Sequence, residues 1–296
     1  MTGWDEAEQR VRDLVRPAPG RVAVVARAVP GGQGFSVAGD ESFTSASLIK
    51  VPVLVSALQQ VEAGALSLTQ RVRVDTSPRV GGSGILAGLS DVTDVSIRDL
   101  LELMITISDN LATNLLIETL SVPTIAASIE AAGLTNTALQ RRLMDLQARS
   151  RGLDNHTCAT DMALLLEQIA VGEGLFGSAD SYRLAREVLA RQQVNDRLPR
   201  QLPHGWVLAH KTGELDGVRH DAGFVTVDSS PVLVIAVLTE GFGTGEEPDA
   251  YGAAAADLVA DVGRIVYSAV GSAGPSAPAR RRSAIRSAEY PRDVSS

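Results

Sequence analysis

The sequence predicts an α+β fold in which a five-stranded antiparallel sheet is flanked by N- and C-terminal helices and an all-helical lobe is inserted. Strand patterns rich in β-branched residues occupy 21–29 and 34–38, and three more follow at 206–212, 219–227 and 232–239. The chain between these two groups has helical periodicity instead. We therefore expect the five strands to form one sheet beside a separate helical lobe.

The first elements follow from local signals. Residues 4–16 have an amphipathic helical pattern, which Pro17–Gly20 ends. The strand that comes next turns at Pro30–Gly32 into the second strand, which predicts a hairpin. The apolar side of the helix consists of Trp4, Ala7, Val11, Leu14 and Val15.

In the middle of the chain, Ser96 is a predicted helix N-cap because Asp99 follows three residues later and apolar residues continue at helical spacing. A last helix is expected at about 250–270. Further helices are expected at about 47–62, 110–120, 122–132, 160–171 and 181–191.

These elements predict one catalytic domain over residues 1–270, with a sheet lobe at about 1–45 and 200–270 and a helical lobe at about 46–199. Residues 271–296 are rich in Gly, Ser and Pro and then in arginine, a composition typical of a disordered tail. Because arginines outnumber acids there, this tail is either a weak electrostatic tether or a solvated end.

Ser47 and Lys50 lie three residues apart at the start of an apolar helix. Positions i and i+3 share a helix face, so the Lys50 amine can lie beside the Ser47 hydroxyl. Pro52 fits a helix that begins near Ser47, because only the first turn tolerates a missing N–H. Serine becomes a good nucleophile when a base takes its proton, and lysine is such a base if burial or another cation lowers its pKa. A surface Ser-x-x-Lys without function is the alternative.

The use of lysine favours the functional interpretation. Of the 27 basic residues, only Lys50 and Lys211 are lysine. Arginine keeps its proton in a protein, whereas lysine can release it. Lysine is therefore retained at the two positions where its amine has a chemical use.

Two further triplets carry polar groups suited to an active site. Ser108–Asn110 lies at a corner between two predicted helices, where Ser108 can relay a proton and Asn110 can bind an amide carbonyl; a helix-capping turn is the alternative. Lys211–Gly213 ends a predicted strand, and it supplies a cation, a hydroxyl and, at Gly213, a position with no side chain to block a substrate.

In their order along the chain, the Ser-x-x-Lys, Ser-Asp-Asn and Lys-Thr-Gly triplets resemble those of the penicillin-recognising serine enzymes, most closely the class A β-lactamases. Ser47 precedes Ser108 by 61 residues and Ser108 precedes Lys211 by 103, and both intervals are similar to those of class A enzymes. The resemblance covers about residues 5–268 and implies a helical lobe beside a five-stranded antiparallel sheet, as predicted above. Its other matching stretches are 82–86, 104–116 and 132–137.

The resemblance also implies a role for each residue. Ser47 is expected to be the acylated nucleophile and Lys50 its neighbouring base. Ser108 is expected to pass a proton toward the leaving nitrogen. Lys211 is expected to lower neighbouring pKa values and to attract a substrate carboxylate, which Thr212 binds.

Further substrate contacts are implied in the same way. Asn110 is expected to bind the side-chain amide of the substrate. The backbone N–H groups of Ser47 and Glu214 are expected to form the oxyanion hole, where one donor is worth about 3–4 kcal/mol. Arg219 or His220 is expected to complete the carboxylate site; an exposed strand pair is the alternative.

One residue of the family pattern is missing. Class A β-lactamases carry a glutamate between the second and third triplets that activates the deacylating water, and the matching loop, residues 139–155, contains no glutamate. Leu143 best matches its position and cannot act as a base. Asp145 is the nearest acid and a possible base only if the loop is shifted. Arg141 and Asp154 are expected to form the ion pair that pins such a loop. Acylation is therefore expected to be fast and deacylation slow, unless an acceptor other than water, or the substrate itself, removes the acyl group.

Three functions remain open. The leading hypothesis is a β-lactamase-like serine hydrolase that cleaves a β-lactam or related cyclic amide through an acyl-serine. The second is an intracellular amidase or esterase, or a peptidase-like acyltransferase, of the same fold. The third is a penicillin-binding or sensor protein that traps its ligand without turnover.

Composition limits the partners. A net charge of −8 argues against nucleic acid. The single Cys158 excludes an internal disulfide, and four scattered histidines have no metal-binding spacing. The N-terminus has no basic segment followed by an apolar run, and no uninterrupted membrane span follows, which predicts a cytoplasmic protein. A secreted protein is the alternative if the start is mis-called or trimmed. We expect a monomer that binds a small molecule, uses no cofactor or metal, and has no membrane partner.

Overall fold

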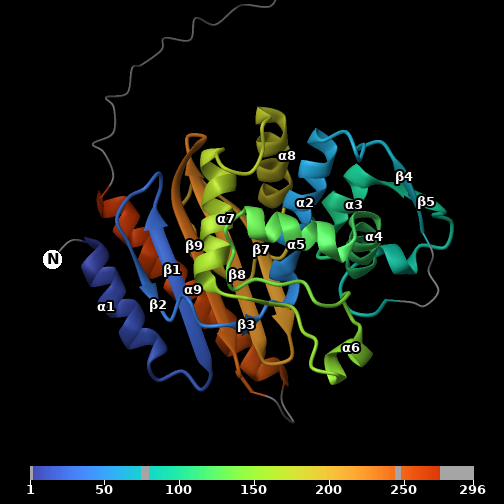
Figure 1. The fold of residues 1–296 in the computed structure, drawn as a ribbon. Coiled ribbons are helices and arrows are strands. Elements are labelled where there is room, and N and C mark those ends of the chain that lie inside the picture. Colours follow the sequence, from blue (N-terminus) through green and yellow to red (C-terminus); the bar gives the residue numbers. More distant parts are fainter. Residues whose placement is uncertain (1–2, 75–79, 244–247, 274–296) are drawn as a thin grey trace, which may run out of the picture.

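The computed structural model describes residues 3–74, 80–243 and 248–273, and its central feature is a five-stranded antiparallel sheet (Figure 1). The strand order is β2-β1-β9-β8-β7. The N-terminal hairpin joins the last strand, with β1 paired to β9 from Arg21↔Glu240 to Ala28↔Leu233. The predicted α+β class is therefore confirmed. The strands are β1 (Arg21–Ala28), β2 (Gly34–Val37), β7 (Trp206–Leu215), β8 (Val218–Val227) and β9 (Ser230–Glu240).

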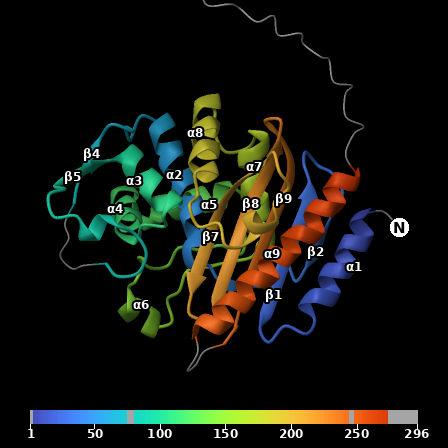
Figure 2. The same cartoon turned by 180° about the vertical axis from the view of Figure 1, so that it is seen from behind.

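Helices cover both faces of this sheet. Helices α1 (Gly3–Val15) and α9 (Pro248–Ala273) pack against one face (Figure 2), and α7 (Ala159–Val171) packs against the other. The alternation of side chains along each strand explains the two layers. In β1, Val24 belongs to the core shared with α1 and α9, and Val25 belongs to the core shared with α7. One helix from the predicted helical lobe thus completes the sheet lobe.

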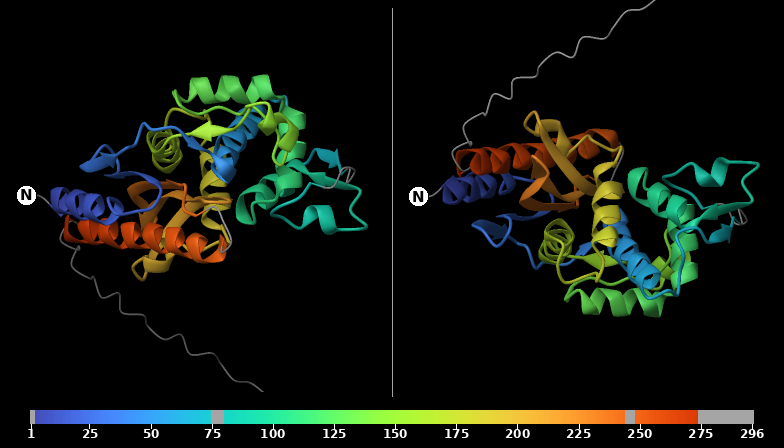
Figure 3. Two further views of the ribbon diagram at one scale, coloured as in Figure 1. Left: turned by 90° about the horizontal axis from the view of Figure 1, so that it is seen from below. Right: turned by 90° about the horizontal axis from the view of Figure 1, so that it is seen from above.

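The helical lobe lies at the β7 side of the sheet, away from α1 and α9 (Figure 3). Its centre is α2, in which every residue from Lys50 to Leu58 is buried. A helix that is apolar on all sides requires neighbours all round, and α2 contacts four other helices. The helices are α2 (Lys50–Glu62), α3 (Ile97–Thr106), α4 (Asn110–Leu120), α5 (Val122–Ala131) and α8 (Ala179–Ala190).

The local signals in the sequence have visible counterparts. Ser96 Oγ accepts a hydrogen bond from the Asp99 N–H (3.1 Å), which confirms the predicted cap of α3. The segment around Ser47 is a short 3₁₀ turn, η1 (Ala46–Ile49), and α2 begins only at Lys50. The sequence analysis did not predict the shortest elements: β3 (Phe43–Thr44), β4 (Arg71–Arg73), β5 (Asp94–Ser96), β6 (His156–Thr157), α6 (Leu146–Ser150), η2 (Leu86–Gly88) and η3 (Leu198–Gln201).

The C-terminal helix is longer than predicted. Helix α9 continues to Ala273, three residues past the predicted end at about 270, and residues 274–296, most of the predicted tail, lie outside the described residues. In the described part of the chain no single helix is both long and apolar enough to cross a bilayer, although the bent pair α4 and α5 passes by length and composition.

Candidate active site

A cleft of about 510 Å³ lies between the end of β7 and the helical lobe. Its walls come from segments that are far apart in the sequence: the η1 turn, the corner before α4, the loop 139–155 and the end of β7. Three of the predicted site residues line it, namely Ser47, Asn110 and Glu214.

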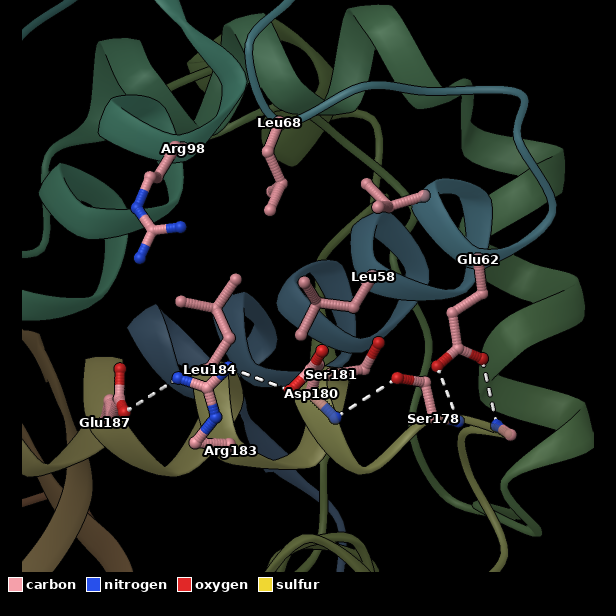
Figure 4. A pocket seen from close by; sticks show the side chains of 12 residues that line it. Leu58, Glu62, Leu68, Arg98, Ser178, Asp180, Ser181, Arg183, Leu184 and Glu187 are labelled. Atoms are coloured by element: carbon pink, nitrogen blue, oxygen red, sulfur yellow. Dashed lines mark hydrogen bonds and ion pairs between the residues drawn. The ribbon is translucent and has the colours of Figure 1, made fainter.

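A larger pocket of about 660 Å³ lies between α2 and the start of α8 (Figure 4). The Glu62 carboxylate accepts hydrogen bonds from the N–H groups of Gly177 and Ser178 (both 2.9 Å), so it caps α8. Asp180 is paired with Arg183 at 2.8 Å. The predicted site residues do not line this pocket. Its polar groups stabilise a helix end, and the cleft beside β7 is the candidate active site.

The η1 turn presents Ser47 at the cleft. Ser47 is half-buried, whereas the Leu48 and Ile49 side chains after it are fully buried and fix the turn in the core. Ala46 has a φ of 45°, an uncommon value for a residue with a side chain. Such backbone strain is often found at functional sites, where the surrounding packing maintains it.

Lys50 is fully buried and makes three hydrogen bonds. Its Nζ donates to the Ser108 carbonyl (2.7 Å), to Ser108 Oγ (2.9 Å) and to Asn110 Oδ1 (2.9 Å). Burial, and then the charge of Lys211, lower the pKa of Lys50 well below its usual value, while the Asp109 carboxylate opposes this shift. Lys50 therefore gives up its proton more readily than an exposed lysine does.

Lys211 reaches the same hydroxyl from the sheet. Its Nζ donates to Ser108 Oγ (3.1 Å) and to the Thr212 carbonyl (2.8 Å). Burial, and then the charge of Arg197, lower the pKa of Lys211 to about 7, against the opposing effect of Asp221 and Glu214. When two amines contact one buried oxygen, the positive charge of one disfavours a positive charge on the other. One of the two amines is therefore readily neutral.

The Lys50 amine was expected beside the Ser47 hydroxyl, but its hydrogen bonds go to Ser108 and Asn110. Among the described residues, neither ammonium group donates a hydrogen bond to Ser47; both donate to Ser108 Oγ. The reason is geometric: the Lys50 side chain leaves the first turn of α2 toward the α3–α4 corner, where three acceptors satisfy its three protons. Ser47 lines the open cleft, and Ser108 lies behind it, 7% exposed.

The Ser108–Asn110 corner is both a helix-capping turn and part of the candidate site, the two interpretations that the sequence left open. Asp109 is a structural cap, since its carboxylate accepts from the N–H groups of Ala112 (2.9 Å), Ile85 and Leu86 (both 2.8 Å). This capping fixes Ser108, at a φ of 58°, and Asn110 on either side. Asn110 Nδ2 donates to the Gly81 carbonyl (3.0 Å) while its Oδ1 accepts from Lys50.

Lys211–Gly213 lies on β7, the edge strand of the sheet. Lys211 and Thr212 are buried. A Cβ on Gly213 would lie 3.0 Å from His220 Cδ2 and 3.3 Å from Ala46 Cβ. The absent side chain therefore lets β7 approach the nucleophile turn closely.

The loop 139–155 is held at both ends. Arg141 pairs with Asp154 (2.6 Å), which confirms the predicted ion pair. Asn114 binds the Leu143 backbone twice, because its Oδ1 accepts from the N–H (2.8 Å) and its Nδ2 donates to the carbonyl (3.0 Å). Leu143, which lines the same cleft as Ser47, is therefore held in a fixed position.

Asp145 was considered as a deacylation base, but its carboxylate has a structural role. Its Oδ1 accepts a hydrogen bond from the Ala148 N–H (2.8 Å) and caps the short helix α6. It does not line the cleft, although its neighbours Met144 and Leu146 do. The structure therefore gives no support to Asp145 as a deacylation base.

The suggestion that Arg219 or His220 completes a carboxylate site is also not supported. His220 is fully buried: its Nε2 donates to the Thr44 carbonyl (2.8 Å) and its Nδ1 accepts from the Thr239 N–H (3.1 Å). Arg219 donates to the Leu215 and Val218 carbonyls of its own hairpin (both 2.8 Å). Neither residue lines the cleft.

His220 makes the fold sensitive to acid. The Nδ1 contact requires the neutral ring, because a protonated ring has no acceptor nitrogen, and burial lowers the pKa of His220 to about 4 from 6.5. Between these values the unfolded chain binds a proton that the folded chain does not, so stability falls as the pH falls, by about 3 kcal/mol in all. Urea unfolding at pH 4 to 7 should show this loss, and His220→Gln should reduce it. An unchanged pH dependence in the variant would contradict the assignment.

Arg197 is a functional residue that was not among the predicted site residues. Its guanidinium is fully buried behind β7, where Nη1 donates to the His220 carbonyl (3.0 Å) and Nη2 to Glu214 Oε2 (2.6 Å). Its charge is the second cause of the low pKa of Lys211. No local pattern distinguishes Arg197 from the other arginines, because its role depends on contacts with β7 and β8.

Comparisons with known proteins agree with this geometry. The family model described as the β-lactamase enzyme family matches residues 6–270. A β-lactamase of Streptomyces fradiae is 29% identical over 269 residues, which cover 89% of this chain and 86% of the relative. The crystal structure of a β-lactamase from Sphaerobacter thermophilus has a TM-score of 0.80 at 30% identity and covers 92% of this chain and 99% of that one.

A third similar structure is a leucine-to-glutamate mutant of PBP-A, an acyl-enzyme complex with penicillin G. It has a TM-score of 0.80 at 29% identity, and the alignment covers 90% of this chain and 97% of that one.

Proposed function

Because the chain belongs to the β-lactamase enzyme family and its relatives support a hydrolase acting on β-lactams, we propose that it cleaves a β-lactam or related cyclic amide through an acyl-Ser47 intermediate that deacylates slowly. The observation that carries this proposal is the pair of buried amines, Lys50 and Lys211, that share Ser108 Oγ, while Ser47, three residues before Lys50 in the chain, lines the cleft. An amine of lowered pKa next to a cleft-lining hydroxyl is the arrangement that nucleophilic catalysis by serine requires.

Acylation proceeds by three proton transfers. Ser47 Oγ attacks the amide carbonyl and neutral Lys50 takes its proton, after a small movement from the contacts described above. The C–N bond then breaks, and the leaving nitrogen takes a proton from Ser108, which is replenished by a lysine ammonium. Ser108 is suited to this relay because both amines contact its hydroxyl. Asn110, which lines the cleft, is the residue proposed to bind the substrate amide.

Slow deacylation is supported by the composition of the loop wall. Leu143 and Met144, from the loop, line the cleft and carry no ionisable group. The carboxylate of the same loop that lines the cleft is that of Asp154, which is already paired with Arg141 and Arg149. A water molecule on this side of the acyl-serine therefore has no free carboxylate from the loop to activate it.

Incubation with a chromogenic cephalosporin, followed by intact-mass measurement, tests the proposal. We expect a stoichiometric mass gain on the protein and a colour burst followed by slow turnover. A mass gain that never decays would indicate a protein that traps its ligand. The absence of any adduct or colour would contradict the proposal and favour an amidase or esterase of the same fold.

A further inference from the structure

Glu214 differs from the other cleft carboxylate with two arginine partners, Asp154, because one of its partners, Arg197, is fully buried. Its Oε2 lies 2.6 Å from Arg197 Nη2, and its Oε1 lies 3.3 Å from Arg219 Nη2. Glu214 also lines the cleft, directly after Lys211–Gly213 on β7. A carboxylate of the protein itself, held by Arg197 and Arg219, therefore lines the cleft on the β7 side.

The buried guanidinium explains why this carboxylate stays in place. The Arg197 side chain is 0% exposed, and the Glu214 side chain is 55% exposed. A buried cation without a counter-charge is strongly destabilising, so Arg197 retains an anionic partner. Its other acidic neighbour, Asp196, lies farther away, at 3.4 Å from Nε. The charge-assisted hydrogen bond from Nη2 to Glu214 is thus the shorter of the two contacts.

An anionic substrate group would compete with the Glu214 carboxylate for the same cations. A substrate carboxylate directed to Lys211 and Thr212 would lie next to the Glu214 carboxylate, and like charges at such separations repel. To use Arg197 or Arg219 instead, it would have to displace Glu214. Specificity often arises from such a repulsive element placed against the unwanted ligand.

We propose that Glu214 determines substrate specificity by disfavouring a carboxylate at this end of the cleft and favouring lactams or related amides that are neutral there. This inference rests on the proposed acyl-Ser47 function, and it names the class of substrate. The side chain of Glu214 carries the effect, whereas its backbone N–H remains available to the oxyanion.

Asp216 provides a matched control. It is an exposed acid two residues farther along the same hairpin, it lines the same cleft, and it forms no ion pair with the described residues. A general change of charge at the cleft affects both positions, whereas competition for the buried guanidinium affects only Glu214.

The test compares a penicillin that carries its free carboxylate with the methyl ester of the same compound. The second-order rate of Ser47 adduct formation is measured by intact mass at pH 6, where Lys211, whose pKa is about 7, is largely charged. Glu214→Gln keeps the shape and removes the charge, and it should raise the carboxylate-to-ester rate ratio by at least about tenfold. Asp216→Asn should change the ratio by less than about twofold. Glu214→Ser, which also removes the charge, repeats the test if the glutamine variant unfolds.

Each outcome bears on one of the two proposals. An unchanged ratio in the Glu214 variants, with adducts still forming, overturns the role of Glu214 alone. An equal change in Asp216→Asn also overturns it, because the effect is then general electrostatics. The absence of an adduct with either compound in the wild type contradicts the proposed function, and with it the inference.

Discussion

Replacing Leu143 with glutamate is expected to raise the rate of deacylation by at least about a hundredfold, the lower end of what a positioned general base contributes. Leu143 lines the cleft, and its backbone is bound on both sides by Asn114, so a side chain at this position has a defined direction. A glutamate there supplies the carboxylate that the loop lacks. The measurement is the decay of the acyl-enzyme mass at pH 7 after excess lactam is removed.

Two controls distinguish base catalysis from altered packing. The Leu143→Gln side chain is close in size to that of Leu143→Glu and is also polar, but it cannot take a proton. This variant should therefore leave deacylation slow. Asp145→Asn should also leave it unchanged, because the Asp145 carboxylate caps α6. If glutamine accelerates deacylation as much as glutamate, a general base is not the missing group. A large loss of deacylation rate in Asp145→Asn would indicate that Asp145 is the deacylation base.

Ser47→Ala should abolish the covalent adduct, whereas Ser108→Ala should form it at a rate lower by about 10²- to 10⁴-fold. The two serines differ in access: Ser47 lines the cleft, and Ser108 lies behind it in contact with both amines. Loss of Ser108 Oγ removes the proton relay but leaves the nucleophile. Peptide mapping of the wild-type adduct should locate the added mass on the peptide that contains Ser47.

Folding of these variants needs its own control. Ser108 has a φ of 58°, so Ser108→Gly removes the hydroxyl without adding strain and serves as a second variant. Thermal unfolding shows whether each variant is folded. An adduct on Ser108, or one that survives Ser47→Ala, would reverse the assigned roles.

Much of the fold followed from local chemistry. The β-branched strands, the Ser96 cap and the long apolar helices are set by residues close together in the sequence, so their positions were predicted within a few residues. The short pairs β3–β6 and β4–β5 were not, because two or three residues form a strand only when a distant partner is already in place.

The site residues also fall into those that the sequence predicted and those that it did not. The two lysines were identifiable because arginine supplies the other cations, and the missing glutamate was visible in the composition of the loop. The burial of Arg197 and His220 was not visible, and His220, with both ring nitrogens satisfied by backbone, was wrongly considered for substrate binding. Contacts between residues far apart in the chain leave no local pattern.

The amino-acid order alone was sufficient to establish the fold class, the family resemblance and the inventory of reactive groups, since each rests on residue type and spacing. The partners of those groups depended on the folded chain. Ser108, rather than Ser47, receives both amines, and Glu214 rather than solvent receives the Arg197 charge. Hydrogen bonds and ion pairs act over a few ångströms in space, and that proximity is created when the helical lobe packs against the edge of the sheet.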